Sequence, residues 1–482
     1  MPWHRVSSAL LRVDPEALWA AVTDVGGWPR WRGGLDGARV SADGNAVDLV
    51  PAGPLGRVHT RTAPPARVAR EASRRLVVEQ AQPGGCMRVT LSIEAEGKTE
   101  GKVETGTEAS GETEVVGELW RLRQVVEVEG PLGPVAAHGL ALPLARGFRD
   151  DVIRLHGLLA AQGGARRARE GLTVVIAGGS GALGRRLGGD LLGRGHDVVV
   201  LTRAVDPGLA LRQVEWDGRT VGPWAELLQV DPARTALVNL AGRLVDVRPT
   251  TANIASLRES RIEPTRALVQ ASAGLEVPLG HWLQASTTAI WGDAGERRCD
   301  ETTPLPTHLP QALPQMTGVA RPWEEAAAGA RTDHTVTLRT SLVLDRDVPV
   351  VDRLAQITRL GLGGPIGNGR QWVSWIHIDD WLRIARASLG LEPGLSIPSG
   401  VLVAASDHPV RNAEMMATLR RQLHRPAAPP TPAALACLGS VVLRSDPALP
   451  LTGRHATSRV LADLGHAYRF PHFEDAVADL LG

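Results

Sequence analysis

A glycine-rich segment that follows an apolar run is the part of this sequence best suited to grip a charged ligand. Residues 172–177 are rich in β-branched side chains and predict a strand buried on both faces. The small residues after this run are Gly178, Gly179, Ser180, Gly181, Ala182, Leu183 and Gly184. Amides that open a helix after such a turn can donate to a diphosphate, with Gly178 making the turn, Gly181 facing the phosphates and Gly184 packing on the strand. The spacing therefore predicts a dinucleotide-binding loop made of these residues.

The end of the second predicted strand, residues 197–202, indicates which dinucleotide fits. An Asp or Glu at this position usually binds the ribose 2′-hydroxyl of NAD. This sequence instead has Thr202 and Arg203, and a guanidinium suits the 2′-phosphate of NADP. We therefore expect NADP(H) in preference to NAD(H), with the nearby Asp206 as the one observation that favours NAD(H).

Three further segments resemble one branch of a known superfamily. They read VNLAG at 238–242, SRIEPT at 260–265 and GLGGPIGNGRQWVSWIHIDD at 361–380. With the glycine-rich loop they resemble the extended, epimerase-like branch of the short-chain dehydrogenase/reductase superfamily, and within it NAD-dependent epimerase/dehydratase-like proteins with a C-terminal domain of unknown function. The resemblance covers about residues 172–482. It implies that Leu240, Ala241 and Gly242 lie beside the adenosine half of the cofactor.

The acid–base pair of that superfamily is missing from this chain. The resemblance implies a tyrosine followed four residues later by a lysine, which helps to lower the pKa of the phenol. The single tyrosine is Tyr468, and the two lysines are Lys98 and Lys102. The stretch where the pair would fall, residues 311–325, reads QALPQMTGVARPWEE. Any hydride-transfer chemistry would therefore depend on other groups.

Two side chains are the leading catalytic candidates. Ser286 follows the fifth predicted strand, where the superfamily carries an assisting hydroxyl. An imidazole such as that of His377 suits acid–base chemistry near neutrality, although the place of His377 between a strand and a helix also fits a structural hydrogen bond. Asp293, Glu324 and Arg339 are further candidates, and Glu324 also fits a charge in the first turn of a helix.

Arg370 and Trp372 lie just ahead of His377 and are candidate substrate contacts. Arg370 could hold the cofactor or an anionic substrate. Trp372 could stack on a ligand or belong to the core. Asp379 and Asp380 are expected to cap the helix that follows. No group of cysteines and histidines has metal-ligand spacing, so no metal site is predicted.

The order of predicted elements divides the chain. Strands alternate with helices over residues 172–400, which predicts an α/β, doubly wound, Rossmann-type parallel sheet with helices on both faces. A small α/β extension follows at 401–482. The Gly- and Arg-rich residues 160–171 are typical of a linker. Residues 1–159 show short alternating strands between helical stretches, as in an α+β domain with an antiparallel sheet.

The first region resembles a helix-grip domain of the START-like, polyketide-cyclase-like (SRPBCC) superfamily. The resemblance depends on the order of elements and on residues 19–31, WAAVTDVGGWPRW. It implies a sheet wrapped around the closing helix, often with a cavity that could hold an apolar ligand. Alternatively, these tryptophans are core residues or an interdomain surface. Residues 94–118 are expected to form an extended hairpin or a mobile insertion.

Composition narrows the partners and the compartment. The 53 Lys and Arg residues against 52 Asp and Glu give a net charge of +1, which provides no excess positive charge for nucleic-acid binding. The three cysteines are far apart and fit a reducing compartment. No apolar run approaches the roughly 20 residues of a membrane span. We expect a cytoplasmic protein with a small-molecule substrate and neither a nucleic-acid nor a membrane partner.

Three functional hypotheses remain open. In the first, the protein binds NADP(H) and transfers hydride to or from a small carbonyl or alcohol. In the second, which the missing Tyr and Lys favour, it is a non-catalytic dinucleotide-binding sensor or scaffold. In the third, it carries an apolar ligand in its first domain.

Overall fold

The computed structural model describes most of the chain and divides it into two compact units. The described residues are 3–52, 65–71, 73–82, 85–96, 119–130, 141–165, 171–307, 317–346, 349–442 and 446–481. The first unit comprises Met1–Gly171, Gly188–Val198 and Asp206–Arg212, and the second comprises the rest. Most of the predicted insertion at 94–118 and part of the predicted linker, residues 166–170, lie outside the described residues.

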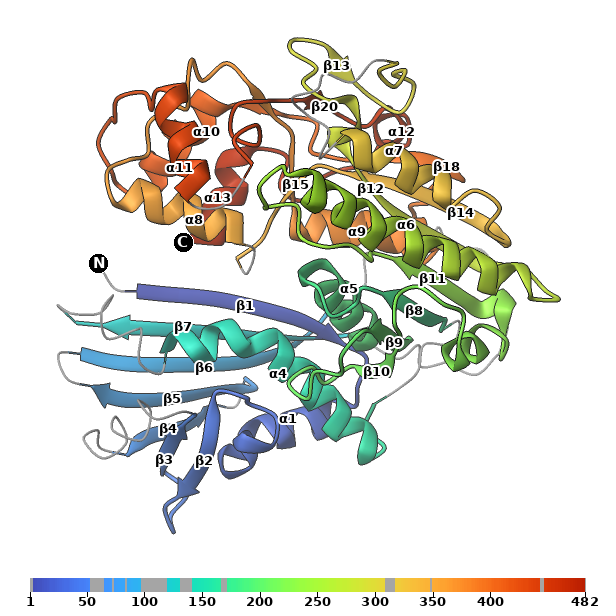
Figure 1. Ribbon diagram of the computed structural model, residues 1–482. Helices are drawn as coiled ribbons and strands as arrows, with labels where there is room; N and C mark the ends of the chain where they lie inside the picture. Colours follow the sequence, from blue (N-terminus) through green and yellow to red (C-terminus); the bar gives the residue numbers. More distant parts are fainter. Residues whose placement is uncertain are drawn as a thin grey trace, which may run out of the picture. The chain divides into compact units, whose positions relative to one another are not determined.

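The first unit contains an antiparallel sheet of seven strands (Figure 1). The strands are β1 (Trp3–Leu11), β2 (Leu35–Val40), β3 (Ala46–Pro51), β4 (Ala66–Glu71), β5 (Arg75–Gln82), β6 (Gly85–Ala95) and β7 (Trp120–Glu129). Their order is β1-β7-β6-β5-β4-β3-β2, so the first and last strands are neighbours. The helices are α1 (Pro15–Thr23), the 3₁₀ helix η1 (Val25–Arg30) and α4 (Ala141–Ala161).

One face of this sheet packs against α4 in a single apolar core. Leu122 and Val126 of β7 alternate with less buried residues, as expected for a strand with one buried face. Leu144, Phe148 and Leu155 of α4 are buried in the same core, as the helical spacing predicts. The sequence predicts a start of this helix near Pro134 and a further core residue at Leu140, and both positions lie outside the described residues.

The tryptophans of segment 19–31 enclose a buried charge. Trp28 and Trp31 are fully buried, and the Arg32 guanidinium lies 4.2 Å and 4.8 Å from their ring centroids. Burial lowers the pKa of Arg32 to about 10, and it raises the pKa of Asp151, whose charge interacts with Arg32, to about 6. Trp28 and Trp31 are therefore core residues, which was one of the two alternatives for this segment.

The second unit is built on another seven-stranded sheet. Its strands are β8 (Thr173–Ala177), β9 (Asp197–Thr202), β10 (Arg212–Glu215), β11 (Thr235–Asn239), β12 (Leu279–Thr287), β14 (Thr332–Thr340) and β18 (Gly400–Ala404). They lie in the order β10-β9-β8-β11-β12-β14-β18, and the pairs from β8 to β18 are parallel. The chain winds outward in both directions from β8 and β11, which confirms the predicted doubly wound sheet.

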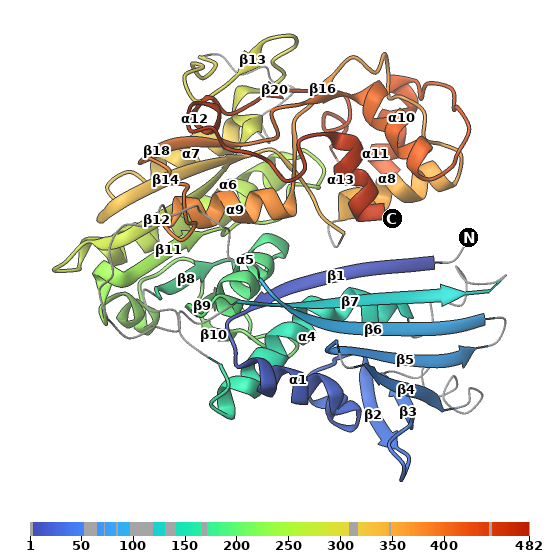
Figure 2. The ribbon, with the colours of Figure 1, turned by 180° about the vertical axis from the view of Figure 1, so that it is seen from behind.

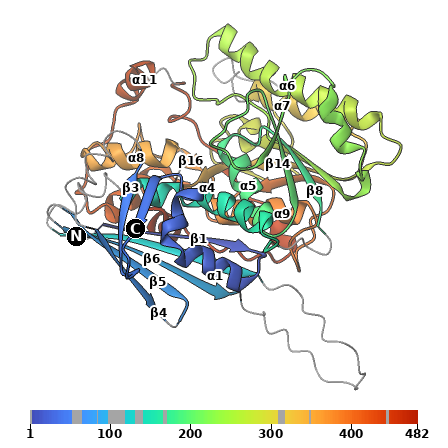
Figure 3. The same ribbon diagram turned by 90° about the horizontal axis from the view of Figure 1, so that it is seen from below.

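Helices cover both faces of this parallel sheet. They are α5 (Ala182–Gly193), α6 (Thr251–Ala273), α7 (Thr317–Ala326) and α9 (Ile378–Ser388). Figure 3 shows α6 and α7 on one face and α5 and α9 on the other, and Figure 2 shows α9 from its own side. The edge strand β18 has no counterpart among the expected strands, and it crosses the boundary predicted at residue 400.

The C-terminal elements form a further apolar cluster in the second unit. Trp375, Met416 and Phe473 are among its buried members. They come from β17 (Trp375–His377), α10 (Asn412–Gln422) and α13 (Phe473–Leu481). The remaining elements are η2 (Pro223–Leu228), η3 (Pro232–Arg234), η4 (Thr288–Trp291), β13 (Arg298–Cys299), β15 (Leu342–Leu344), α8 (Pro349–Arg359), β16 (Trp372–Val373), β19 (Val410–Arg411), α11 (Ala433–Val442), β20 (His455–Ala456) and α12 (Arg459–Asp463).

A buried polar network fixes the centre of the parallel sheet. Asn239, the last residue of β11, is fully buried. Its Nδ2 donates to Thr265 Oγ1 of α6 at 2.8 Å and to Gln284 Oε1 of β12 at 3.0 Å. Its Oδ1 accepts the amide of Ala241 at 3.2 Å. One side chain therefore joins two strands, a helix and the loop that follows β11.

Replacing Asn239 should destabilise the second unit. We expect Asn239→Ala to lower the free energy of unfolding by about 2–4 kcal/mol, because it leaves the buried Gln284 oxygen with one donor fewer and opens a small cavity. Thermal unfolding followed by circular dichroism would measure the change. Gln229→Ala, at an exposed position, serves as the control, and equal midpoints for the two variants would contradict the role given to this network.

Candidate functional site

The glycine-rich loop leaves β8 and enters α5 in a tightly packed turn. Gly178 has a φ of +76°, a conformation that favours glycine. A Cβ on Gly178 would lie 2.7 Å from the carbonyl oxygen of Leu240. A Cβ on Gly184 would lie 2.4 Å from the Cα of Gly179. Glycine is therefore required for the turn and for the close packing of α5, which are the structural roles that the spacing predicts.

Gly181 differs from Gly178 and Gly184, because the packing of the protein around it does not require a glycine. A Cβ there would approach only the carbonyl oxygen of Gly178, at 3.3 Å. Gly181 and Ala182 are exposed, and Ala182 and Leu183 open α5. The first amides of a helix have no acceptor within the helix, and the dipole places partial positive charge there. The loop thus presents donors and free space to an anion.

The second strand of the unit ends beside this loop. Thr202 Oγ1 donates to the carbonyl of Ala204 at 2.9 Å and lies 3.4 Å from the hydroxyl of Ser180. Arg203 is exposed next to it. Asp206 accepts the amide of Gly208 at 2.8 Å, which closes a short turn. The structure therefore brings Thr202 to the loop and leaves the Arg203 side chain on the surface.

The segment after β11 completes the same edge of the sheet. The amide of Leu240 donates to the carbonyl of Ala177 at 2.9 Å. Leu240 and Ala241 also supply the atoms nearest to Gly178. Leu240 and Ala241, two of the three residues predicted at the adenosine half, therefore contact the glycine-rich loop directly.

Arg261 ties together two of the segments that carry the family resemblance and the helix α7. A Cβ on Gly242 would lie 3.0 Å from the Arg261 Cζ, so a larger residue here would crowd this guanidinium. Arg261 Nη2 donates to the carbonyl of Arg243 at 2.9 Å, and Cζ lies 5.1 Å from the ring centroid of Trp323. Burial lowers the pKa of Arg261 to about 10. The loop after β11, α6 and α7 therefore meet at one side chain.

Ser286 lies in a polar triad at the carboxyl end of β12. Ser286 and Arg339 are register partners on β12 and β14, and Glu324 reaches both from α7. The Ser286 hydroxyl donates to Glu324 Oε1 at 2.5 Å. Arg339 Nε and Nη2 donate to Glu324 Oε1 and Oε2, each at 2.9 Å. We call Ser286, Glu324 and Arg339 the SER triad. Glu324 lies near the end of α7, so the prediction that it is a charge in the first turn of a helix is wrong.

The SER triad is largely shielded from water. The side chains of Arg339 and Glu324 are 6% and 15% exposed. The Arg339 Cζ lies 5.1 Å from the ring centroid of Trp291, whose indole N–H donates to the carbonyl of Thr303 at 3.2 Å. In such surroundings a charge-assisted hydrogen bond is strong, and removing one partner is costly.

Tyr468 is unsuited to act as a base in this fold. Its hydroxyl donates to the carbonyl of Ala405 at 2.6 Å, and burial raises the pKa of the phenol above its ordinary value. A phenol that ionises less readily cannot take a proton near neutrality. Residues 311–316, the first part of the stretch where the pair would fall, lie outside the described residues, and α7 forms the rest.

His377 holds the start of α9. Its Nδ1 accepts the amide of Asp379 at 3.1 Å, which makes His377 the N-cap of the helix. The ring is 2% exposed, with Nε2 at 3.4 Å from Asp479 Oδ2 and the ring of Phe470 at 3.9 Å. These contacts serve a helix terminus and share no residue with the SER triad. The catalytic role of His377 stays a prediction that its contacts do not favour.

The two aspartates after His377 do not cap α9 as expected. They lie in its first turn instead. Asp380 is buried, and its carboxylate accepts the amides of Arg469 and Phe470 at 2.7 and 3.0 Å. Asp379 pairs with the Arg469 guanidinium at 3.0 Å. These aspartates therefore anchor the segment that precedes α13.

Trp372 is enclosed by other side chains. Its ring stacks on His455 with centroids 4.1 Å apart, and the Arg411 Cζ lies 4.1 Å from the ring centroid. Its indole N–H donates to Glu296 at 3.1 Å. Hydrogen bonds from Arg411 and Trp372 lower the pKa of Glu296 to about 2. Arg370 is 74% exposed and lies 3.9 Å from Glu296. Both substrate assignments stay predictions, and stacking of a ligand on Trp372 would require His455 or Arg411 to move.

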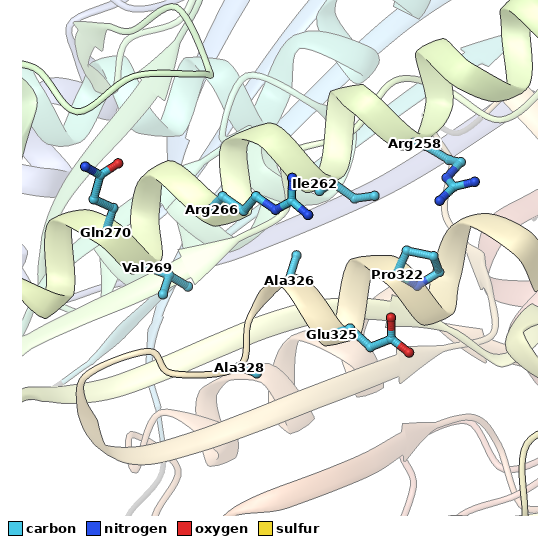
Figure 4. Close-up of a pocket in the computed structure, with 9 residues that line it drawn as sticks. All are labelled: Arg258, Ile262, Arg266, Val269, Gln270, Pro322, Glu325, Ala326 and Ala328. Atoms are coloured by element: carbon cyan, nitrogen blue, oxygen red, sulfur yellow. The ribbon is translucent and has the colours of Figure 1, made fainter.

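A separate hollow of about 580 Å³ opens between α6 and α7 (Figure 4). Its polar lining comes from Arg258, Arg266, Gln270 and Glu325, none of which is a predicted site residue.

In the described part of the chain, no group of three or more His, Cys, Asp or Glu side chains could hold a metal ion. The described helices include none that is long and apolar enough to cross a membrane.

The fold and the loop geometry define the class of this protein, a doubly wound α/β protein of the dehydrogenase and epimerase type. A model of the NAD dependent epimerase/dehydratase family matches residues 174–391. The epimerase family protein SDR39U1 of Bos taurus is 30% identical over 315 residues, which cover 64% of this chain and 100% of that protein. A chloroplastic homolog of SDR39U1 from Arabidopsis thaliana is 28% identical over 319 residues, 64% of this chain and 87% of its own. The chain therefore belongs to the epimerase family that includes SDR39U1.

Solved structures agree with this assignment. Human SDR39U1, crystallised with NADPH, is 28% identical with a TM-score of 0.55, over 64% of this chain and 99% of that chain. A nucleoside-diphosphate sugar epimerase from Corynebacterium glutamicum is 19% identical with a TM-score of 0.53, over 99% of this chain and 90% of that chain. The second likeness concerns the fold alone, and it extends over nearly the whole chain.

Sequence patterns identify Ser286 but miss the arrangement around it. Glu324 and Arg339 are candidates by residue type alone, and nothing in their spacing indicates that they form one ion pair. Arg261 is missed entirely, although an arginine in an otherwise apolar stripe of a predicted helix is a signal of a buried structural role. Its neighbour Gly242 gives the second signal, since a glycine after a strand often marks a close approach.

Glu324 and Arg339 of the SER triad should contribute to the stability of the protein in a coupled, non-additive way. Arg339→Met leaves the Glu324 carboxylate partly buried with no charged partner and should cost about 3 kcal/mol of stability. The double variant Arg339→Met, Glu324→Gln should lose clearly less than the sum of the two single losses. Thermal unfolding midpoints of the four proteins measure the coupling. Strictly additive losses would show that the ion pair has no energetic significance.

Proposed function

We propose that this protein binds NADP(H) through the loop at residues 178–184 and uses it for hydride transfer to or from a small carbonyl or alcohol. The observation that carries the proposal is the open end of α5. There, Gly181 leaves space that the protein does not fill, and the amides of Ala182 and Leu183 lack acceptors within the helix. A diphosphate satisfies these donors and the helix dipole together.

The residues near the loop fit NADP(H) better than NAD(H). Thr202 and Arg203 stand where a carboxylate would bind the 2′-hydroxyl of NAD, and the exposed guanidinium can pair with a 2′-phosphate. The NADPH present in the human relative's crystal structure supports the same choice. Leu240, Ala241 and Gly242 would then border the adenosine half, as the resemblance implies.

The substrate is expected at the carboxyl ends of β11 and β12. In doubly wound sheets, ligands lie outside the carboxyl ends of the strands, where the strand order reverses. Ser286 is on β12, next to β11 in the sheet. When bound, the cofactor supplies the hydride chemistry, and the Ser286 hydroxyl is the polar group best placed to meet a carbonyl or hydroxyl of the substrate. In this proposal, the SER triad takes the place of the missing Tyr and Lys.

Nucleotide titration tests the loop directly. Gly181→Ala should weaken NADPH binding about tenfold, equivalent to about 1.4 kcal/mol, because the methyl group enters the space left for the phosphates. Its unfolding midpoint should match that of the control Gly439→Ala, whose added Cβ meets nothing within 4 Å. The wild-type protein should bind NADPH more tightly than NADH. Unchanged NADPH fluorescence on adding the wild-type protein would reject the proposal.

We also propose that the first unit is a START-like helix-grip domain that could carry an apolar ligand. The support is the order of its antiparallel strands, in which β1 lies beside β7, and the packing of α4 against the apolar face of the sheet. Mass spectrometry of a solvent extract of the full-length protein should then detect an apolar compound at a fixed ratio to protein. An extract without such a compound would count against the carrier role.

A further inference from the structure

The hydrogen bonds of the SER triad fix the direction in which Ser286 donates. Arginine has only N–H donors, and Arg339 directs two of them at the two carboxylate oxygens of Glu324. An ionised carboxylate has only acceptors, so the Ser286 proton must point toward Oε1, 2.5 Å from the hydroxyl oxygen. The lone pairs of Ser286 are left for a ligand. A group that meets Ser286 in this state must be a donor, such as a hydroxyl.

We propose that Ser286 takes the proton of a substrate hydroxyl and passes its own proton to Glu324, so that the protein oxidises a secondary alcohol with NADP⁺. The inference rests on the proposed NADP(H)-dependent hydride transfer and adds the proton acceptor, the hydrogen-bond polarity and the substrate class. Ser286 is the catalytic residue, because it touches the substrate. Glu324 receives the proton of Ser286, and Arg339 is a positioning residue that acts through Glu324.

The step balances in atoms and electrons. The C–H bond of the carbinol carbon breaks, and its electron pair leaves as hydride to the nicotinamide of NADP⁺, which is reduced to NADPH. The O–H bond of the alcohol breaks, the proton goes to Ser286 Oγ, and the remaining pair forms the C=O bond of the ketone. The original proton of Ser286 moves to Glu324 Oε1. Glu324 returns it to water, which its 15% exposed side chain can reach.

The fold explains why this carboxylate stands where it does. Trp323 packs against Arg261 and fixes one side of α7, while Glu324 faces the sheet on the next residue. The adjacent Glu325 is exposed and lines the hollow between α6 and α7 instead. The pair of neighbouring glutamates therefore provides one residue in the proposed relay and one matched control outside it.

Alcohol oxidation by the full-length protein tests the relay. The probes are 1-phenylethanol, 1-indanol and cyclohexanol with NADP⁺, followed at 340 nm. Glu324→Gln and Ser286→Ala should each lower kcat by about 10²–10³-fold, the usual contribution of a proton acceptor. The KM for NADP⁺ should not change, and Glu325→Gln should behave as wild type. Formate should restore part of the kcat of Glu324→Ala, an effect that a purely structural role would not produce.

The outcomes separate this inference from the proposed function. Absence of NADPH binding rejects the proposed function. NADPH binding without oxidation of any of the three alcohols overturns the relay and leaves the cofactor proposal standing. Equal kcat for Glu324→Gln and Glu325→Gln also overturns it, as does a Glu324→Ala variant that formate does not rescue. If the Glu324 variants fail to fold, Ser286→Ala decides, and a kcat equal to wild type would overturn the relay.

Discussion

The close packing of backbone on backbone at the start of α5 is the constraint on which the second unit depends. Because Gly184 has no side chain, α5 packs directly on the turn. Because Gly178 has none, the turn packs against the residues that follow β11. Both contacts are too short to accommodate a Cβ, so the turn and the start of α5 require glycine at these two positions. The opening amides of α5 therefore lie next to the carboxyl end of β8. The geometry that makes this loop a proposed anion site therefore comes from packing that is independent of any ligand.

Two buried cations hold α7 in place. Arg261 lies between Gly242 and Trp323, and Arg339 binds Glu324 in a fork. Each guanidinium is desolvated, and each is compensated by carbonyl, carboxylate or ring contacts, as buried charges require. A helix held this firmly can position Glu324 to within hydrogen-bonding distance of Ser286. Precision at the site is therefore a property of the helix anchors.

Much of the second unit could be predicted, because short stretches of sequence are enough to indicate its strands and its glycine-rich turn. The strands around Ile176 and Val238 are short apolar runs, and the glycine spacing between strand and helix has few other uses. The fork between Glu324 and Arg339 could not be predicted, since it depends on how α7 crosses β14, and sequence spacing does not encode that crossing. Trp372 shows the same limit, because its stacking partner His455 comes from a distant part of the chain. For His377, a structural hydrogen bond is one of two alternatives drawn from the sequence, but its N-cap role is not predicted, because the cap is expected from Asp379 and Asp380.

We propose that the opening of α5 holds the diphosphate of NADP(H). A crystal structure of the full-length protein grown with NADPH would test this proposal. We expect diphosphate oxygens within about 3 Å of the amide nitrogens of Ala182 and Leu183, with the 2′-phosphate beside Arg203. A nucleotide bound elsewhere, or no bound nucleotide at a saturating NADPH concentration, would contradict it.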